Sequence, residues 1–241
     1  MTMARQVLIT GVTGGIGGAL AESFTANGDM VIGIGRRRDK LTALRDRLGE
    51  SLDSLQADLE TVEGIDAAVD ALGDRANAID VLINNAGSMK FTPTHALNAH
   101  DVHSQLAINL LAPIWLTRKL LPGMIDRKSG LIVNMASAAG ERPSPKLAAY
   151  GAAKAGLIHF TRTLAAEYAD AGIRCVAIAP GPVHTGLVDK FTMAMIVRSV
   201  PLKRAALPAE IADFVRYIAS NAVNLATGSV FTVDGGLSIR S

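Results

Sequence analysis

The chain has 241 residues, 49% of them hydrophobic, which is enough to bury a sizeable core in one domain or two. Its 24 lysines and arginines against 22 aspartates and glutamates leave a formal charge of +2, too small an excess to drive nucleic-acid binding. The single cysteine, Cys175, excludes an internal disulfide framework and fits a reducing cytoplasm, and the sequence has neither a signal-peptide pattern nor a run of membrane-spanning length.

Short β-branched runs alternate with longer helical stretches along the chain. Seven strands are predicted, at residues 6–10, 30–34, 54–57, 81–84, 130–136, 173–179 and 229–234. Helices are predicted between them, near 15–27, 38–48, 61–76, 98–125, 148–171 and 208–220. The alternation indicates an α/β fold, a doubly wound parallel sheet of Rossmann type with helices on both faces. No linker or repeat interrupts it, so one domain over 1–241 is expected.

A glycine-rich turn, "TGVTGGIGG", follows the first strand and opens the first helix. Gly11, Gly15 and Gly17 permit a tight turn and close approach of a pyrophosphate, and the helix N-terminus supplies unpaired N–H groups. The spacing differs from the usual Gly-x-Gly-x-x-Gly, but the strand, turn and helix context favours dinucleotide binding.

The second strand ends in "GIGRRRDK", with no carboxylate where an NAD-binding fold usually has one. Arginines at the start of a helix oppose its dipole, and a bound phosphate removes that conflict. Arg36 and Arg37 are therefore predicted to hold the 2′-phosphate of NADP, rather than to form a solvated charged surface.

Several stretches, taken together, resemble the short-chain dehydrogenase/reductase family from about Gln6 to Gly236. They are "TGVTGGIG", "NNAG", "AINLLAP", "VNMASAA", "YGAAK", "PGPVHT" and "VDGG", in this order along the chain. Within the family, the length, the short lid and the "VDGG" ending look most like the 3-oxoacyl-thioester (3-oxoacyl-acyl carrier protein) reductase type. The resemblance implies a homotetramer.

The resemblance also implies the site. Ser137, Tyr150 and Lys154 would be catalytic, and Asn109 would complete a proton relay. Asp58 would bind the adenine, Asn84 and Gly87 would flank the adenine ribose, and Thr185 would touch the carboxamide end. The other implied cofactor contacts are Thr13, Ile16, Leu59, Ala86, Pro180, Gly181 and Val183, beside Gly11, Gly15, Gly17, Tyr150 and Lys154.

The residue types suit this chemistry. Tyr150 and Lys154 are four apart, so they are neighbours on one helix face, and a nearby ammonium favours ionisation of a phenol. A pKa of Tyr150 lowered toward neutrality is therefore expected from this ammonium together with a positively charged oxidised nicotinamide. Ser137 follows the fifth strand, where a hydroxyl can stabilise an oxyanion. Pro113 has no N–H to give the carbonyl of Asn109, which is expected to be free for a relay water or simply to mark a kink.

These features predict an NADP-dependent reductase of a ketone or 3-oxoacyl thioester, with Tyr150 as general acid. Two alternatives stay open: an alcohol, sugar-alcohol or steroid dehydrogenase of the same family, and a non-catalytic regulator that binds NADP(H). The spacing of His95, His100 and His103 lacks a recognised ligand pair, so no metal is expected. Residues 181–205, rich in Pro, Gly and Met, are predicted to form a substrate lid.

Overall fold

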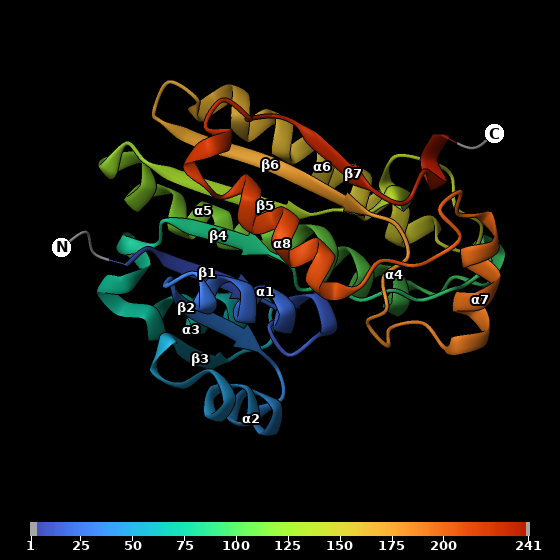
Figure 1. Cartoon of the computed structure of the whole chain (residues 1–241), viewed down its shortest axis with the longest axis horizontal. Helices are drawn as coiled ribbons and strands as arrows, with labels where there is room; N and C mark the ends of the chain where they lie inside the picture. The colour runs from blue at the N-terminus through green and yellow to red at the C-terminus, as the bar shows by residue number, and fades with distance from the viewer. Residues whose placement is uncertain (1–3, 240–241) are drawn as a thin grey trace.

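Seven parallel strands form one sheet in the order β3-β2-β1-β4-β5-β6-β7 in the computed structural model, which describes residues 4–239 (Figure 1). The strands are β1 Gln6–Thr10, β2 Met30–Gly35, β3 Leu52–Gln56, β4 Val81–Asn84, β5 Gly130–Met135, β6 Ile173–Pro180 and β7 Val230–Val233. Each overlaps its predicted range, and the doubly wound α/β fold is confirmed. The order reverses direction between β1 and β4, and in such sheets ligands bind beyond the carboxyl ends of the strands at that point.

Eight α-helices connect or follow these strands in the described part of the chain. They are α1 Gly15–Ala26, α2 Arg38–Leu48, α3 Val62–Leu72, α4 Ala99–Leu106, α5 Ala112–Arg127, α6 Ala148–Tyr168, α7 Lys190–Ser199 and α8 Pro208–Ile218. Apolar residues of α1, α2 and α8 cover one face of the sheet, and those of α3, α5 and α6 cover the other (Figure 1). None of these helices is long and apolar enough to cross a membrane within residues 4–239.

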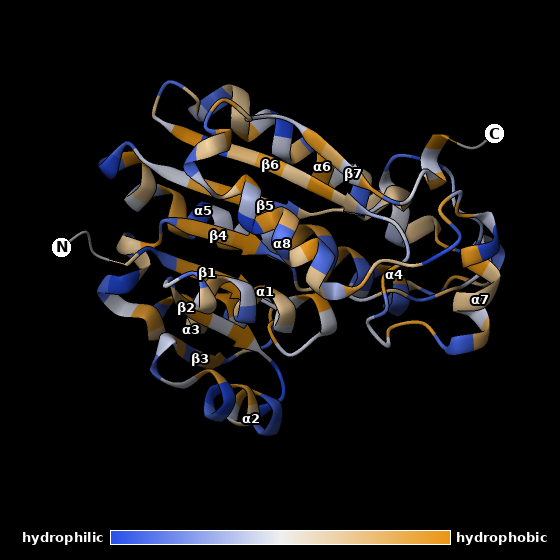
Figure 2. Ribbon diagram, viewed as in Figure 1, coloured by the Kyte–Doolittle hydropathy of each residue, from blue (hydrophilic) through white to orange (hydrophobic). Residues whose placement is uncertain are grey.

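Side-chain alternation along the strands separates the two cores. Val7 and Ile9 of β1 pack under α1 and α8, whereas Leu8 between them packs on the opposite face. Successive side chains of a strand point to opposite faces, so a strand buried on both sides is apolar throughout. The central strands β1 and β4 are accordingly coloured as hydrophobic in Figure 2, whereas α2 includes many hydrophilic residues.

The predicted helix over 98–125 has a π-helical turn, Ala107–Leu111, between α4 and α5. The N–H of Ala112 donates to the carbonyl of Ala107, five residues back. Pro113 follows at once and cannot donate to Asn109, so a regular α-helical ladder is not possible here. π turns of this kind occur often at functional sites.

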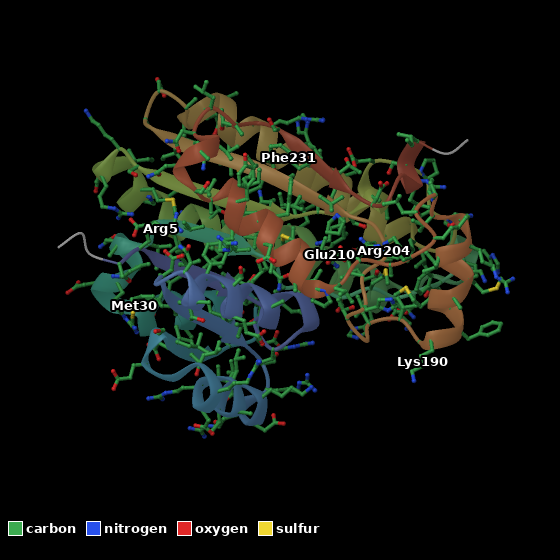
Figure 3. The ribbon with its side chains drawn as sticks, in the orientation of Figure 1. Arg5, Met30, Lys190, Arg204, Glu210 and Phe231 are labelled. Atoms are coloured by element: carbon green, nitrogen blue, oxygen red, sulfur yellow. The ribbon has the colours of Figure 1, made fainter. Side chains whose placement is uncertain are left out.

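Residues 183–206 form an excursion between β6 and α8, and the two ends of this excursion lie side by side in a narrow neck. Val183 and Ala206 form an isolated bridge, and the N–H of His184 donates to Ala206 at 3.0 Å. Arg204 at this neck pairs with Glu210 of α8 at 2.7 Å (Figure 3). The segment contains α7, which lies beyond the carboxyl ends of the strands and is capped by Asp189 through the N–H groups of Phe191 and Thr192 (Figure 1).

Candidate active site

Two adjoining cavities lie at the carboxyl ends of the strands. One, of about 420 Å³, is the glycine-lined cavity, bounded by the β1–α1 turn and the end of β2. The other, of about 390 Å³, is the tyrosine-lined cavity, bounded by the end of β5, the start of α6 and α7. Both are bordered by the same five residues, Ile16, Asn85, Gly87, Thr185 and Leu187, so one elongated ligand can occupy both.

The glycine-lined cavity contains most of the residues predicted to bind the cofactor. It brings together Gly11, Thr13, Gly15, Ile16, Gly17, Arg36, Arg37, Leu59, Ala86, Gly87 and Thr185. The remaining predicted residues of β6 and its loop, Pro180, Gly181 and Val183, line the tyrosine-lined cavity instead.

Close packing explains the glycines of the turn. Gly11 has φ of +68°, and a Cβ there would lie 2.7 Å from Cα of Ala86. A Cβ on Gly17 would overlap the carbonyl oxygen of Gly11, and one on Gly15 would lie 2.9 Å from Cα of Thr185. Helix α1 begins at Gly15 without a side-chain cap, so its first N–H groups face the cavity floor with positive partial charge. An anion such as a pyrophosphate suits that position.

Arg36 at the end of β2 is not isolated. Its Nη1 lies 3.0 Å from Oε1 of Glu60, whose Oε2 accepts a hydrogen bond from Ser104 of α4 at 2.9 Å. The Arg36 side chain is 61% exposed, and Arg37 beside it makes no ion pair within residues 4–239. Arg36 thus has a carboxylate partner from the loop after β3, and Glu60 itself does not line the glycine-lined cavity.

Asp58 is exposed and lies between two lining residues, Ala57 and Leu59, without lining the cavity itself. Its Oδ1 accepts a hydrogen bond from the N–H of Glu60 at 3.1 Å. Its predicted adenine contact therefore stays a prediction.

The structure corrects the expectation for Asn84. Its side chain is buried away from both cavities and donates to Oδ1 of Asn134 on β5 at 2.8 Å. Asn84 lies two residues after Leu82, so strand alternation turns it toward the α5 and α6 side. Asn85, which was not among the predicted site residues, borders both cavities and donates through Nδ2 to the carbonyl of Thr10 at 2.9 Å.

Ser137, Tyr150, Lys154 and Asn109 all line the tyrosine-lined cavity. Ser137 follows β5, and its hydroxyl hydrogen-bonds to Tyr150 at the start of α6. Two glycines allow this approach: a Cβ on Gly140 would lie 2.8 Å from the backbone of Lys154, and one on Gly151 would lie 2.8 Å from the carbonyl of Ala139. The loop after β5 therefore packs directly on α6.

Burial governs the protonation of Tyr150 and Lys154. It raises the pKa of Tyr150, and the hydrogen bond with Ser137 offsets only part of that rise. It also lowers the pKa of Lys154 from 10.5 to about 7, so this ammonium is only partly charged at neutral pH. In the chain alone, desolvation outweighs any attraction of the phenolate by the lysine, and the lowered pKa expected with a bound oxidised nicotinamide stays a prediction.

Lys154 and Asn109 meet across Gly87. The side chain of Lys154 is buried and donates to the carbonyl of Met135 at 2.8 Å. Asn109, on the π turn, donates to the carbonyls of Ser88 at 2.8 Å and Gln105 at 2.9 Å, but its Oδ1 has no partner in the described structure. A Cβ on Gly87 would lie 2.7 Å from that Oδ1 and 3.7 Å from Nζ of Lys154. A buried acceptor without a partner calls for a bound donor.

Residues 5–195 match the family described as short chain dehydrogenase. The chain belongs to the short-chain dehydrogenase family. It is 40% identical over 96% of its length to an uncharacterized short-chain type dehydrogenase/reductase of Sinorhizobium fredii, of which it spans 43%. It is 33% identical to a 3-oxoacyl-[acyl-carrier-protein] reductase of Synechocystis sp., with 97% of each chain covered.

Solved structures of short-chain dehydrogenases agree. One described as an NAD(P)-dependent gluconate 5-dehydrogenase from Beutenbergia cavernae, with bound NADP, is 31% identical at a TM-score of 0.93, covering 99% of this chain and 98% of that one. A 3-ketoacyl-(acyl-carrier-protein) reductase from Brucella melitensis, with NADH, is 30% identical at a TM-score of 0.91, covering 97% and 98%. The resemblance drawn from the sequence is confirmed at the level of the family.

A nicotinamide dinucleotide, the cofactor of short-chain dehydrogenases, fits these residues. The glycine turn leaves room for a backbone contact, the N-terminus of α1 accepts a pyrophosphate, and the orphaned Oδ1 of Asn109 lies beside the buried amine of Lys154. This short-chain dehydrogenase also has a cavity residue outside the predicted site, Arg142, in the loop between β5 and α6. No sequence motif predicts this position, because the conformation of the loop determines whether Arg142 reaches the cavity.

Proposed function

We propose that this chain is an NADP-dependent oxidoreductase that reduces a ketone or a 3-oxoacyl thioester to the alcohol. The observation that carries the proposal is the convergence of Ser137, Tyr150 and Lys154 on one cavity that continues into the glycine-lined cavity. The similarity to 3-oxoacyl-[acyl-carrier-protein] reductases supports the thioester branch. Arg36 and Arg37 at the far end of the glycine-lined cavity support NADP over NAD, since two cations there suit a phosphate.

The nicotinamide, when bound, supplies the hydride, and the chain must position the carbonyl and protonate its oxygen. Tyr150 is the acid in this proposal. Its raised pKa keeps the phenol protonated, and therefore able to donate, at neutral pH. Ser137, hydrogen-bonded to Tyr150, is placed to donate to the same developing oxyanion.

Lys154 is proposed to bind the cofactor ribose and to take part in a proton relay. An ammonium has three donors, and the contact with Met135 uses one of them. The others are available for a ribose hydroxyl and for the relay that replaces the proton of Tyr150. Asn109 joins that relay through its backbone carbonyl, as the resemblance implies, and its unpartnered Oδ1 offers a second acceptor.

We propose that residues 181–205 close over the substrate as the lid, since Met193 and Ile196 of α7 line the tyrosine-lined cavity. We further propose a homotetramer. Leu111 and Trp115, one turn apart, expose apolar surface on the outer side of α5 and its preceding π turn. Light scattering after size-exclusion chromatography measures the assembly, and a monomer would contradict it.

The decisive experiment measures NADPH oxidation with an acetoacetyl thioester for the wild type and for Tyr150→Phe. A matched control is Tyr168→Phe, which removes the same hydroxyl from the same helix outside both cavities. Loss of the acid is expected to lower kcat by about 10² to 10⁴-fold while NADPH still binds, with the control unaffected. Equal turnover by both variants would remove Tyr150 from the mechanism, and a preference for NADH would overturn the choice of NADP.

If neither this thioester nor a panel of ketones and alcohols is turned over while NADPH binds, the chain is a regulator that senses the cofactor. Turnover of other ketones or alcohols alone would move the substrate away from thioesters and leave the roles of Ser137, Tyr150 and Lys154 intact.

A further inference from the structure

Arg142 brings a cation to the wall of the tyrosine-lined cavity. Among the residues of the described range 4–239 that line this cavity, the only charged side chains are Arg142 and Lys154, and none is acidic. Arg142 is partly buried in the same wall as Ser137 and Tyr150. Lys154 serves the cofactor side of the proposed mechanism, which leaves Arg142 as the cation available to a substrate.

The guanidinium of Arg142 lacks a counterion in the described part of the chain. Its Nη1 donates to the carbonyl of Leu237 at 3.1 Å, and it makes no ion pair within residues 4–239. The neighbouring Glu141 is turned to the outside, where it accepts a hydrogen bond from Thr232. Keeping a partly desolvated cation beside apolar walls is costly unless an anion joins it.

We propose that the substrate of this chain is a small oxo acid, whose carboxylate binds Arg142 while its ketone lies at Ser137 and Tyr150. The inference rests on the proposed function and narrows its ketone branch. In this proposal Arg142 is a substrate-binding residue, and it makes the enzyme selective for oxo acids over neutral ketones, alcohols and steroids.

Charge and size favour a carboxylate over the other anions. A planar guanidinium binds a carboxylate with two parallel hydrogen bonds, and one cation matches its single charge. A phosphate monoester carries about −1.5 to −2 charges at pH 7 and would remain partly unpaired beside one arginine. The 390 Å³ of the cavity must also accept the nicotinamide, which limits the substrate to a small molecule.

The other residues that line the cavity indicate what kind of carbon chain this acid has. Met89, Phe91, Met193 and Ile196 surround the cavity with apolar surface from two separate segments. An oxo acid with a short alkyl chain buries that chain against these side chains and leaves its carboxylate for Arg142. Thioether side chains adapt to alkyl groups of different shape.

A structural role for Arg142 is the competing explanation, since its contact with Leu237 ties the loop after β5 to the turn after β7. That role predicts equal effects on charged and neutral substrates. The test therefore compares each acid with its methyl ester, which keeps the ketone and the alkyl chain and removes the charge.

The experiment measures kcat and KM for NADPH oxidation with acetoacetate, levulinate and α-ketoisocaproate and with their methyl esters. The proteins are the wild type, Arg142→Gln, Arg142→Lys and the control Lys146→Gln, which removes one positive charge from the same loop outside the cavity. For the preferred acid, the wild type is expected to show a KM about tenfold or more below that of the ester. Arg142→Gln should raise the KM for the acid alone, Arg142→Lys should restore part of the difference, and the control should retain all of it.

If the wild type has the same KM for each ester as for the corresponding acid, the inference is overturned. It is also overturned if Arg142→Gln raises the KM for acid and ester equally. If the wild type reduces the acetoacetyl thioester or the esters and shows no preference for the acids, the proposed reductase function stands. Only the proposed binding of a substrate carboxylate by Arg142 is then rejected. If the wild type turns over none of these carbonyl compounds, the proposed function and this inference are overturned together.

Discussion

Nζ of Lys154 lies 5.7 Å from the centroid of the Tyr150 ring and donates to the carbonyl of Met135 at 2.8 Å. The amine therefore sits under the phenol, within the protein, with one hydrogen-bond partner from β5. Burial is what gives each group an unusual pKa, and the two shifts favour the neutral form of both side chains. The free protein carries the cost of this arrangement in its stability.

Lys154→Met should stabilise the protein without cofactor at acidic and neutral pH. A pKa lowered from 10.5 to about 7 corresponds to a penalty on the order of 5 kcal/mol below pH 7, at about 1.36 kcal/mol per pKa unit. The lost hydrogen bond to Met135 offsets about 1 kcal/mol of the gain. Urea denaturation at several pH values measures the difference.

The sign of its pH dependence follows from linkage. Between about pH 7 and 10.5 the unfolded chain holds the lysine proton more tightly than the folded chain, so wild-type stability should rise with pH in that window. The variant should lack this rise, and the two curves should converge near the top of it. Parallel curves would contradict the buried amine.

Asn84→Ala should reduce stability and leave cofactor binding unchanged, because Asn84 belongs to the core. It removes the donor to Oδ1 of Asn134, and an acceptor left unpaired in the core costs about 1–3 kcal/mol. Thr117→Val is the milder companion, since its contact with Asn84 is longer, at 3.3 Å. Thermal unfolding and NADPH titration separate the two readouts, and weakened NADPH binding with normal stability would restore the original assignment.

Gly17→Ala and Gly18→Ala, adjacent in α1, should have opposite effects. A Cβ on Gly17 overlaps the carbonyl of Gly11 and would push the turn apart, so cofactor binding and stability should both fall. A Cβ on Gly18 would lie 3.7 Å from the carbonyl of Val12, an ordinary contact, and should stabilise the helix by about 0.4–1 kcal/mol. Melting temperatures and NADPH affinities measured side by side test the pair. Equal tolerance of both alanines would mean that the turn is loosely packed.

Glu60→Gln should strengthen NADPH binding several-fold and leave NADH binding unchanged. Glu60 pairs with Arg36 at 3.0 Å, so a 2′-phosphate must compete with this carboxylate for the arginine and is repelled by it. Arg36→Gln should have the opposite effect on NADPH. Glu22→Gln, which breaks a comparable exposed ion pair with Arg47, is the control. Unequal effects on NADPH and NADH from the control, or none from Glu60→Gln, would show that the pair does not set cofactor choice.

The sequence by itself determined the fold class and most of the site, because both depend on local patterns. Alternating strand and helix periods place seven parallel strands, and their carboxyl ends share one edge of the sheet. Gly11, Ser137 and Tyr150 each follow a strand or open a helix at that edge, so their positions along the chain already group them. The weakly periodic segment before α8 gave no sign that α7 would be a capped helix.

Only the tertiary structure decided which side chains face each other across that edge. Glu60 reaches Arg36 from another βα loop, and Arg142 reaches the cavity through a loop held to Leu237, nearly a hundred residues along the chain. Asn84 and Asn85 differ by one position, but strand alternation sends the first into the core and leaves the second at the cavities. Burial, which sets the pKa of Tyr150 and Lys154, depends on every element packed around them. The strand periods fix where the site is, and non-local packing fixes its charge and its contacts.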